Sequence, residues 1–119
     1  MVSHDAFSAE MASKLIWNCT FGLMCDVYNT SVGELVDGRR DEVDQLIGEL
    51  CMVAMRGISC RLDASQVSDD LCAYSLQIRD YQGAVKQWEW RNGWFVETAA
   101  SLSLPTPVHS GLLARLGRP

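Results

Sequence analysis

One stretch of eleven residues without a charged side chain, Leu15 to Cys25, constrains the fold more than any other segment. Such a stretch is too short to cross a bilayer as a helix. Its large side chains fall on two stripes at helical spacing: Trp17, Phe21, Met24 and Tyr28 on one, and Leu15, Cys19 and Leu23 on the other. A helix that is apolar on most of its sides must be covered on most of its sides. The sequence therefore predicts a central helix from about Asp5 or Ser8 to Tyr28.

Lys14 stands directly before this stretch and is one of only two lysines in the chain. In a helix, Lys14 and Asn18 lie one above the other on the same face, and Gly22 continues that line. The glycine leaves a gap, so a cation and an amide would face room for a ligand, as in a small-molecule pocket. Alternatively, Lys14 only extends its ammonium group into water from a core helix. The spacing alone leaves both interpretations open.

The other segments also repeat apolar residues at helical spacing, and none shows the sustained alternation of a strand. Local signals mark helix starts at Ser31, at Asp41, at Asp63 or Ser65, and at Thr106 followed by a proline. We therefore expect an all-α bundle of about six helices around the central one, forming a single domain over residues 1–119. The later helices are expected at about 31–36, 41–57, from 63 or 65 onward, 85–101 and 107–116. In the fifth helix, the expected core residues are Trp88, Phe95, Ala99 and Leu102.

Charge and composition exclude several classes of function. The net charge of −5 and the isoelectric point near 4.8 argue against a surface for nucleic acid or for an anionic membrane. The five cysteines are odd in number and lack C-x-x-C spacing, which predicts reduced, buried thiols in a cytoplasmic protein. His4 and His109 have no carboxylate or cysteine at ligand spacing, so we expect surface positions for both and no metal site.

A series of short motifs follows in a characteristic order over most of the chain, from about Lys14 to Leu116. They are Lys14-Leu15-Ile16-Trp17-Asn18-Cys19, Gly33-Glu34-Leu35, Glu49 with Gly57, Ser75, Asn92-Gly93 and Pro105-Thr106-Pro107-Val108. On these motifs the chain resembles the C-terminal helical domain of the ketopantoate reductase (2-dehydropantoate 2-reductase) family. No single motif is specific, whereas six in the right order are good evidence for the fold.

The resemblance implies a fold and an activity. Family members reduce a small 2-keto acid with NADPH, which an N-terminal Rossmann domain holds while the helical domain closes over the substrate. The family lysine donates a proton to the carbonyl oxygen, a role that would fall to Lys14. Substrate binding would fall to Asn18 and Ser75, and also to Gln87, which stands where the family has a glutamate.

Three positions depart from the family pattern near the expected cleft. Gln87 offers an amide without charge, Gly22 replaces a second asparagine, and Arg79 replaces an aspartate. Each change removes or alters a polar group. Ketopantoate itself is therefore a doubtful substrate, and another 2-keto acid or an inactive descendant is equally open.

A phosphate-binding glycine motif is also absent, because no two glycines are separated by a single residue. We therefore expect the Rossmann domain to be missing, and NADP, which the resemblance implies, not to bind this chain alone. The chain reads as the substrate-binding half of a reductase that needs a Rossmann domain in cis or in trans. The alternative is a non-catalytic helical interaction or dimerisation module. Because an apolar face would be left bare, a homo-oligomer is expected in either case.

Overall fold

The structure is a computed structural model that describes residues 4–117, with side chains from residue 9 onward. No strand occurs within the described range, which confirms the all-α prediction. The elements are α1 (His4–Tyr28), α2 (Val32–Gly38), α3 (Arg40–Gly57), α4 (Ala64–Gln77), the short 3₁₀-helix η1 (Trp88–Trp90), α5 (Asn92–Ser101) and α6 (Pro107–Arg115).

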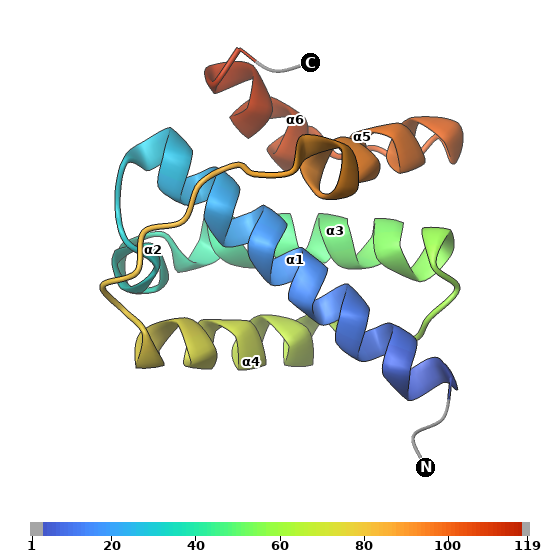
Figure 1. Cartoon of the computed structure of the whole chain (residues 1–119), viewed down its shortest axis with the longest axis horizontal. Coiled ribbons are helices and arrows are strands. Elements are labelled where there is room, and N and C mark those ends of the chain that lie inside the picture. Colours follow the sequence, from blue (N-terminus) through green and yellow to red (C-terminus); the bar gives the residue numbers. More distant parts are fainter. Residues whose placement is uncertain (1–3, 118–119) are drawn as a thin grey trace.

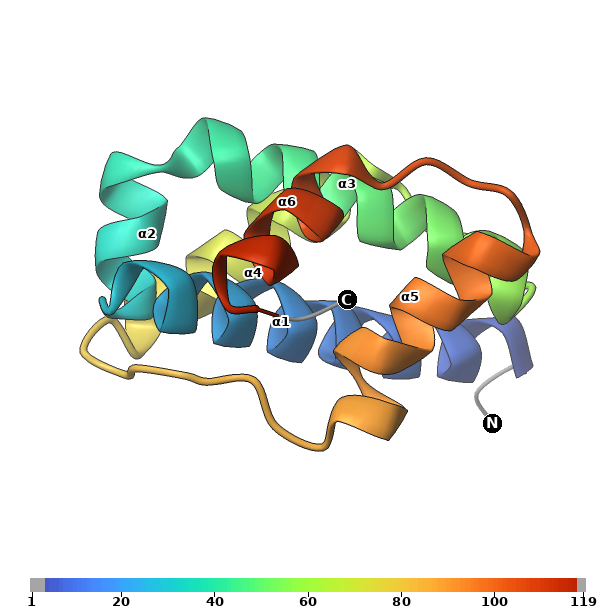
Figure 2. The same ribbon diagram turned by 90° about the horizontal axis from the view of Figure 1, so that it is seen from above.

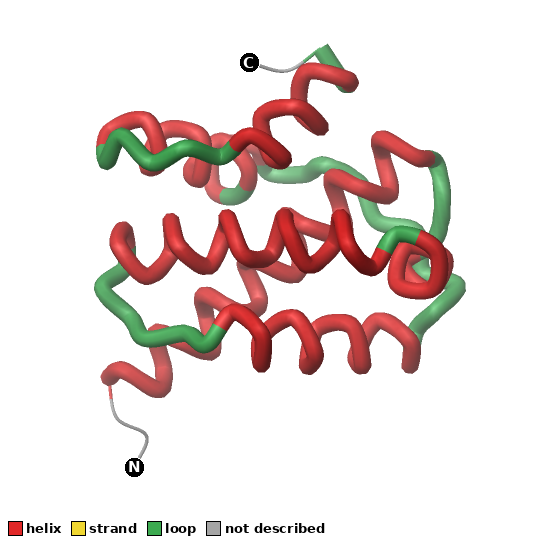
Figure 3. Tube along the Cα trace, turned by 180° about the vertical axis from the view of Figure 1, so that it is seen from behind, coloured by secondary structure: helices red, strands yellow, loops and turns green. Residues whose placement is uncertain are grey.

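The helices are arranged around α1 and α3 (Figure 1). α1 runs obliquely across the front of α3, while α5 and α6 lie on one side of this pair and α4 lies on the other. Seen from behind, α3 and α4 run side by side, with α2 at one end of both (Figure 3). No described helix is both long enough and apolar enough to cross a membrane.

The uncharged stretch forms the centre of the core, as the sequence predicts. All seven residues from Cys19 to Cys25 are buried, so two turns of α1 have no face toward water. Toward the N-terminus the helix emerges, because Trp17 and Asn18 are half-buried and Lys14 is exposed. Such a helix needs neighbours all round, and the helices alone do not supply them.

The remaining cover comes from a turn and the loop that follows it, residues 78–87, which we call the strap. The sequence analysis wrongly began the fifth helix at Val85, because α5 begins only at Asn92. The strap instead crosses the face of α1 that points away from α3 (Figure 2). It ends at Gln87, whose φ of 48° is left-handed, and η1 follows. The prediction that Leu102 lies in the core is also wrong, since this residue is 37% exposed.

Hydrogen bonds fasten the strap at both ends. The first amides of α2 donate to it, from Val32 N to the carbonyl oxygen of Tyr81 at 2.8 Å and from Gly33 N to that of Arg79 at 3.0 Å. Farther along, Val85 N donates to the Asp26 carboxylate at 2.7 Å. The strap therefore satisfies the orphan donors of one helix while it covers another.

Two helices are capped by the residues that the local sequence signals indicate, and a third is capped by a residue far away in the sequence. Ser31 caps α2, and the Asp63 carboxylate caps α4 by accepting from Ser65 N and Gln66 N at 3.1 and 3.2 Å. The hydroxyl of Thr106 makes no such bond at α6. The carboxylate of Glu49 on α3 accepts instead from Val108 N and His109 N, at 2.8 and 2.9 Å.

His109 is fully buried, so the surface position expected for it is wrong; the side chain of His4 lies outside the described residues. Asn92 explains the burial, because its amide nitrogen donates both to the Cys19 carbonyl, at 3.2 Å, and to His109 Nε2, at 3.1 Å. Nδ1 then carries the ring proton and has no partner within the described residues. Burial lowers the pKa of His109 from 6.5 to about 4.

This pKa predicts an acid-sensitive fold. Between pH 6.5 and about 4 the unfolded chain binds a proton at His109 that the native chain does not, so stability falls as the pH drops through that window. From pH 7.5 to pH 5 the loss should be about 2 kcal/mol. Urea midpoints of the parent and of His109→Gln measure it. Glutamine does not titrate, so the variant should lose less; equal losses in both proteins would contradict the assignment.

Candidate functional site

An open groove lies where α1 emerges from the core beside α4. Its lining comes from Ser13, Lys14, Trp17, Asn18, Leu71 and Tyr74. The volume of ≈ 440 Å³ falls within the range of small-molecule sites, roughly 300–1,000 Å³. One wall is apolar, while Lys14 and Asn18 supply a cation and an amide. The groove is therefore amphipathic along its width.

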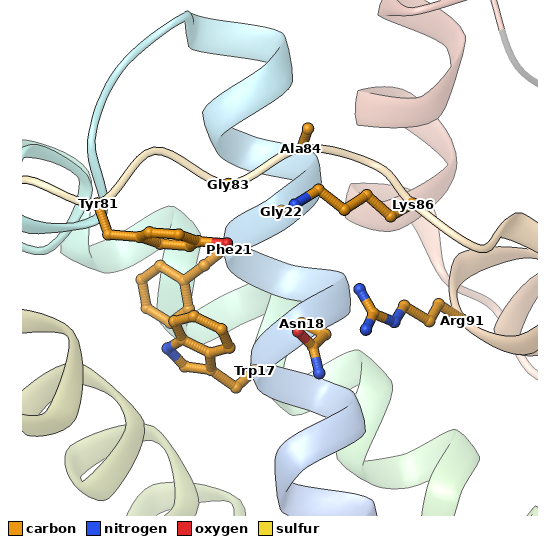
Figure 4. A pocket seen from close by; sticks show the side chains of 9 residues that line it. All are labelled: Trp17, Asn18, Phe21, Gly22, Tyr81, Gly83, Ala84, Lys86 and Arg91. Atoms are coloured by element: carbon orange, nitrogen blue, oxygen red, sulfur yellow. The ribbon is translucent and has the colours of Figure 1, made fainter. Parts of the chain in front are cut away.

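A second hollow continues the groove beyond Trp17 and Asn18, underneath the strap (Figure 4). Its other lining residues are Phe21, Gly22, Tyr81, Gly83, Ala84, Lys86 and Arg91. With ≈ 20 Å³ it has room for about one water molecule. The groove, rather than this hollow, has the size of a substrate site.

The gap expected at Gly22 is not free for a ligand. A Cβ at Gly22 would lie 2.6 Å from the carbonyl oxygen of Ala84, and a Cβ at Gly83 would lie 3.2 Å from the Gly22 Cα. The strap therefore fills the gap with its own backbone. Gly22 does leave a gap, as the sequence analysis expected, because the close approach requires a glycine. The gap is filled by the backbone of the strap and not by a ligand.

Lys14 and Asn18 are brought together on the groove wall. The Lys14 side chain is exposed, as expected for an ammonium group that reaches water, and it also lines the groove. The Asn18 amide nitrogen donates to the Lys14 carbonyl at 3.0 Å, which holds the side chain against the helix. Both sequence interpretations of Lys14 are thus compatible with its position.

Ser75 and Gln87 lie apart from this pair. Ser75 is fully buried on α4, where its hydroxyl donates to the Leu71 carbonyl at 2.8 Å and accepts from Trp17 Nε1 at 3.0 Å. Gln87 is exposed at the end of the strap and belongs to the lining of neither the groove nor the hollow.

Two further cations lie near Asn18 that the sequence analysis did not select. The Arg91 guanidinium points toward Asn18, and the Lys86 side chain reaches back over Gly22 (Figure 4). None of Lys14, Lys86 and Arg91 forms an ion pair within the described part of the chain, and no carboxylate lines the groove or the hollow. In a chain of net charge −5, this is a locally positive site.

The thiols and acids of the described residues offer no competing chemistry near the groove. All five cysteines are buried, as expected. Desolvation raises the pKa of Cys19 to about 12, although Arg91 acts in the opposite direction, so this thiol stays protonated at neutral pH. No cluster of three or more potential metal ligands occurs within residues that the structure describes.

Comparison with known proteins identifies the family of this chain. Residues 6–118 match the family model described as ketopantoate reductase PanE/ApbA C terminal. The chain belongs to this family. The resemblance inferred from the motifs is therefore confirmed, and with it the all-helical architecture. No curated protein matches the chain in sequence.

Two solved structures share the fold. One is the ternary structure of D-mandelate dehydrogenase with NADH and anilino(oxo)acetate, and the other is the complex of D-mandelate dehydrogenase with NADH. Each matches 97% of the chain with a TM-score of 0.80 and 16% identity. The chain spans only about half of those proteins, 52% and 51% of their lengths.

The close packing at Gly22 gives a testable prediction. Gly22→Ala should lower the free energy of unfolding by about 1–3 kcal/mol, because its Cβ would collide with strap backbone that is held in place. Gly48→Ala is the matched control, since nothing lies within 4 Å of a Cβ at that helical glycine. It should instead stabilise α3 by about 0.5–1 kcal/mol. Urea unfolding measures the change in the free energy of unfolding for both variants. Equal changes would show that the strap moves away to make room for the Cβ at Gly22.

Proposed function

We propose that this chain is the substrate-binding and proton-donating half of an NAD(P)-dependent reductase of 2-keto acids. The observation that carries the proposal is the groove beside Lys14 and Asn18, near which Lys86 and Arg91 stand without ion-pair partners among the residues that the structure describes. Family membership supports the reaction type. Unbalanced positive charge suits a carboxylate substrate, and a lysine suits a carbonyl that must be polarised.

The chain has no parallel sheet within its described residues and hence no strand-turn-helix unit for a pyrophosphate. The nicotinamide cofactor is therefore assigned to a Rossmann domain, supplied in cis or in trans. When bound there, the cofactor supplies a hydride to the keto carbon. NADP is the family's cofactor, and the two similar structures contain NADH.

The residues of this chain would act on the other side of the substrate. The Lys14 ammonium hydrogen-bonds the keto oxygen and gives it a proton, which turns the keto acid into a hydroxy acid. The Asn18 amide holds the same end of the substrate, and the charges of Lys86 and Arg91 attract its carboxylate. Gln87, which lies outside both the groove and the hollow, is left out of the proposed substrate contacts. We expect the assembled enzyme in the cytoplasm.

Lys14→Ala tests the proton donor. In the chain combined with a family-type Rossmann domain, the substitution should lower kcat by about 10²–10⁴ against a panel of 2-keto acids, as loss of a positioned acid does. Arg56→Ala is the control, because Arg56 is exposed on α3 and lies outside the groove. Equal turnover by Lys14→Ala and the parent would leave Lys14 as a solvated surface residue and remove the catalytic assignment.

A non-catalytic dimerisation module is the second candidate, and exposed apolar side chains favour it. Met11 is 54% exposed, Met52 50% and Trp90 75%. Where side chains of this kind gather in one apolar patch, the patch usually meets a partner. We therefore expect the isolated chain to form a homo-oligomer in sedimentation equilibrium and a family Rossmann domain to compete with self-association. A monomer at high protein concentration would contradict this expectation.

A further inference from the structure

Three different interactions hold the ring of Trp17 in the groove. Its Nε1 donates to the buried Ser75 hydroxyl at 3.0 Å. The ring meets Tyr74 edge-on, with centroids 5.4 Å apart, and stacks with Tyr81 of the strap at 6.0 Å and 25°. An indole held from α4 and from the strap has little freedom to turn.

The hydrogen bond to Ser75 also decides which part of the indole the groove meets. The only polar atom of the ring is directed into the protein, toward a hydroxyl with no exposed surface. The carbon surface of Trp17 is left to line the groove, together with Leu71 and Tyr74. Lys14 and Asn18 provide the polar side.

We propose that the groove selects a 2-oxo acid with a planar aromatic side chain, and that Ser75 is a positioning residue that fixes Trp17 as the wall for that side chain. The inference rests on the proposed function and narrows its substrate class. The carboxylate and keto oxygen face the cations and Asn18, while the aromatic ring lies against Trp17 and Tyr74, an arrangement that rings favour.

A substrate with a hydroxylated side chain fits this wall less well. The Ser75 hydroxyl already donates to Leu71 and accepts from Trp17, so it has no second proton to offer. A substrate hydroxyl against Trp17, Leu71 and Tyr74 would leave water for a carbon surface, which costs free energy. Because both of its hydrogen bonds are made within the protein, Ser75 holds Trp17 in place and does not bind the substrate.

Steady-state kinetics of the chain assembled with a family-type Rossmann domain test the wall, with phenylpyruvate and pyruvate as the two substrates. Trp17→Leu should raise KM for phenylpyruvate about tenfold or more and change KM for pyruvate less than about twofold, since only the larger acid reaches the wall. Trp90→Leu is the matched control, because Trp90 is 75% exposed and does not line the groove. A Trp17→Leu protein with unchanged selectivity overturns the proposal.

Ser75→Ala tests the positioning role. It should raise KM for phenylpyruvate by about three- to fivefold at nearly constant kcat, and broaden or shift the Trp17 indole N–H signal in a ¹H–¹⁵N spectrum. In a Trp17→Phe background, which lacks the N–H, the same change should have no further effect on selectivity. A loss of selectivity that persists in that background shows that Ser75 acts independently of Trp17, and overturns its assigned role.

The inference and the proposed function fail separately. If Lys14→Ala abolishes reduction of both acids while Trp17→Leu affects them equally, the reductase assignment stands and the aromatic wall does not. If the assembled protein reduces neither acid, titration of its Trp17 indole N–H decides. A shift with phenylpyruvate and none with pyruvate supports the wall without the chemistry, whereas no shift with either acid overturns it.

Discussion

The structure depends on covering two buried turns of α1 on every side. Helices α2, α3, α4 and α6 pack against α1 but cover it incompletely, and the strap completes the cover only because Gly22 lets its backbone approach. An exposed strip there would place apolar surface of the stretch 19–25 in water. The path of the strap is therefore determined by the core that it covers. This path also places Tyr81 and Lys86, which line the hollow beside the groove.

The ion-paired arginines and the unpaired cations lie in different parts of the molecule. Arg40 and Arg79 are held by carboxylates, at 2.8 Å from Asp44 and from Asp69, and at 3.0 Å from Asp37. The cations near the groove have no such partners among the described residues. Exposed pairs contribute little to stability, so pairing Arg91 or Lys86 would add little to the fold. Leaving these groups unpaired preserves a positive field for a ligand.

The sequence predicts what depends on neighbours in the chain and misses what depends on distant partners. The extent of α1 and the caps at Ser31 and Asp63 follow from spacing within a few residues. Residues 85–91 were mistaken for the start of the fifth helix because their pattern contains no sign of the contact between the strap and Gly22. His109 was placed outside because its partner Asn92 is 17 residues away. At the site, Lys14 and Asn18 stood out by their helical spacing, whereas the link between Trp17 and Ser75 spans 58 residues.

The groove lies at the point where α1 leaves the core, and this position suits a site that must be both accessible and rigid. Over the next two turns of α1, from Cys19 to Cys25, every residue is buried, whereas from residue 9 to residue 13 only Ala12 is buried. At Lys14, Trp17 and Asn18 the backbone is still anchored by the buried turns, while the side chains face the groove. Groups on such an element keep their geometry better than groups on a loop. Under the proposed function, a helical half built in this way would determine which acid is bound and where its carbonyl meets a proton.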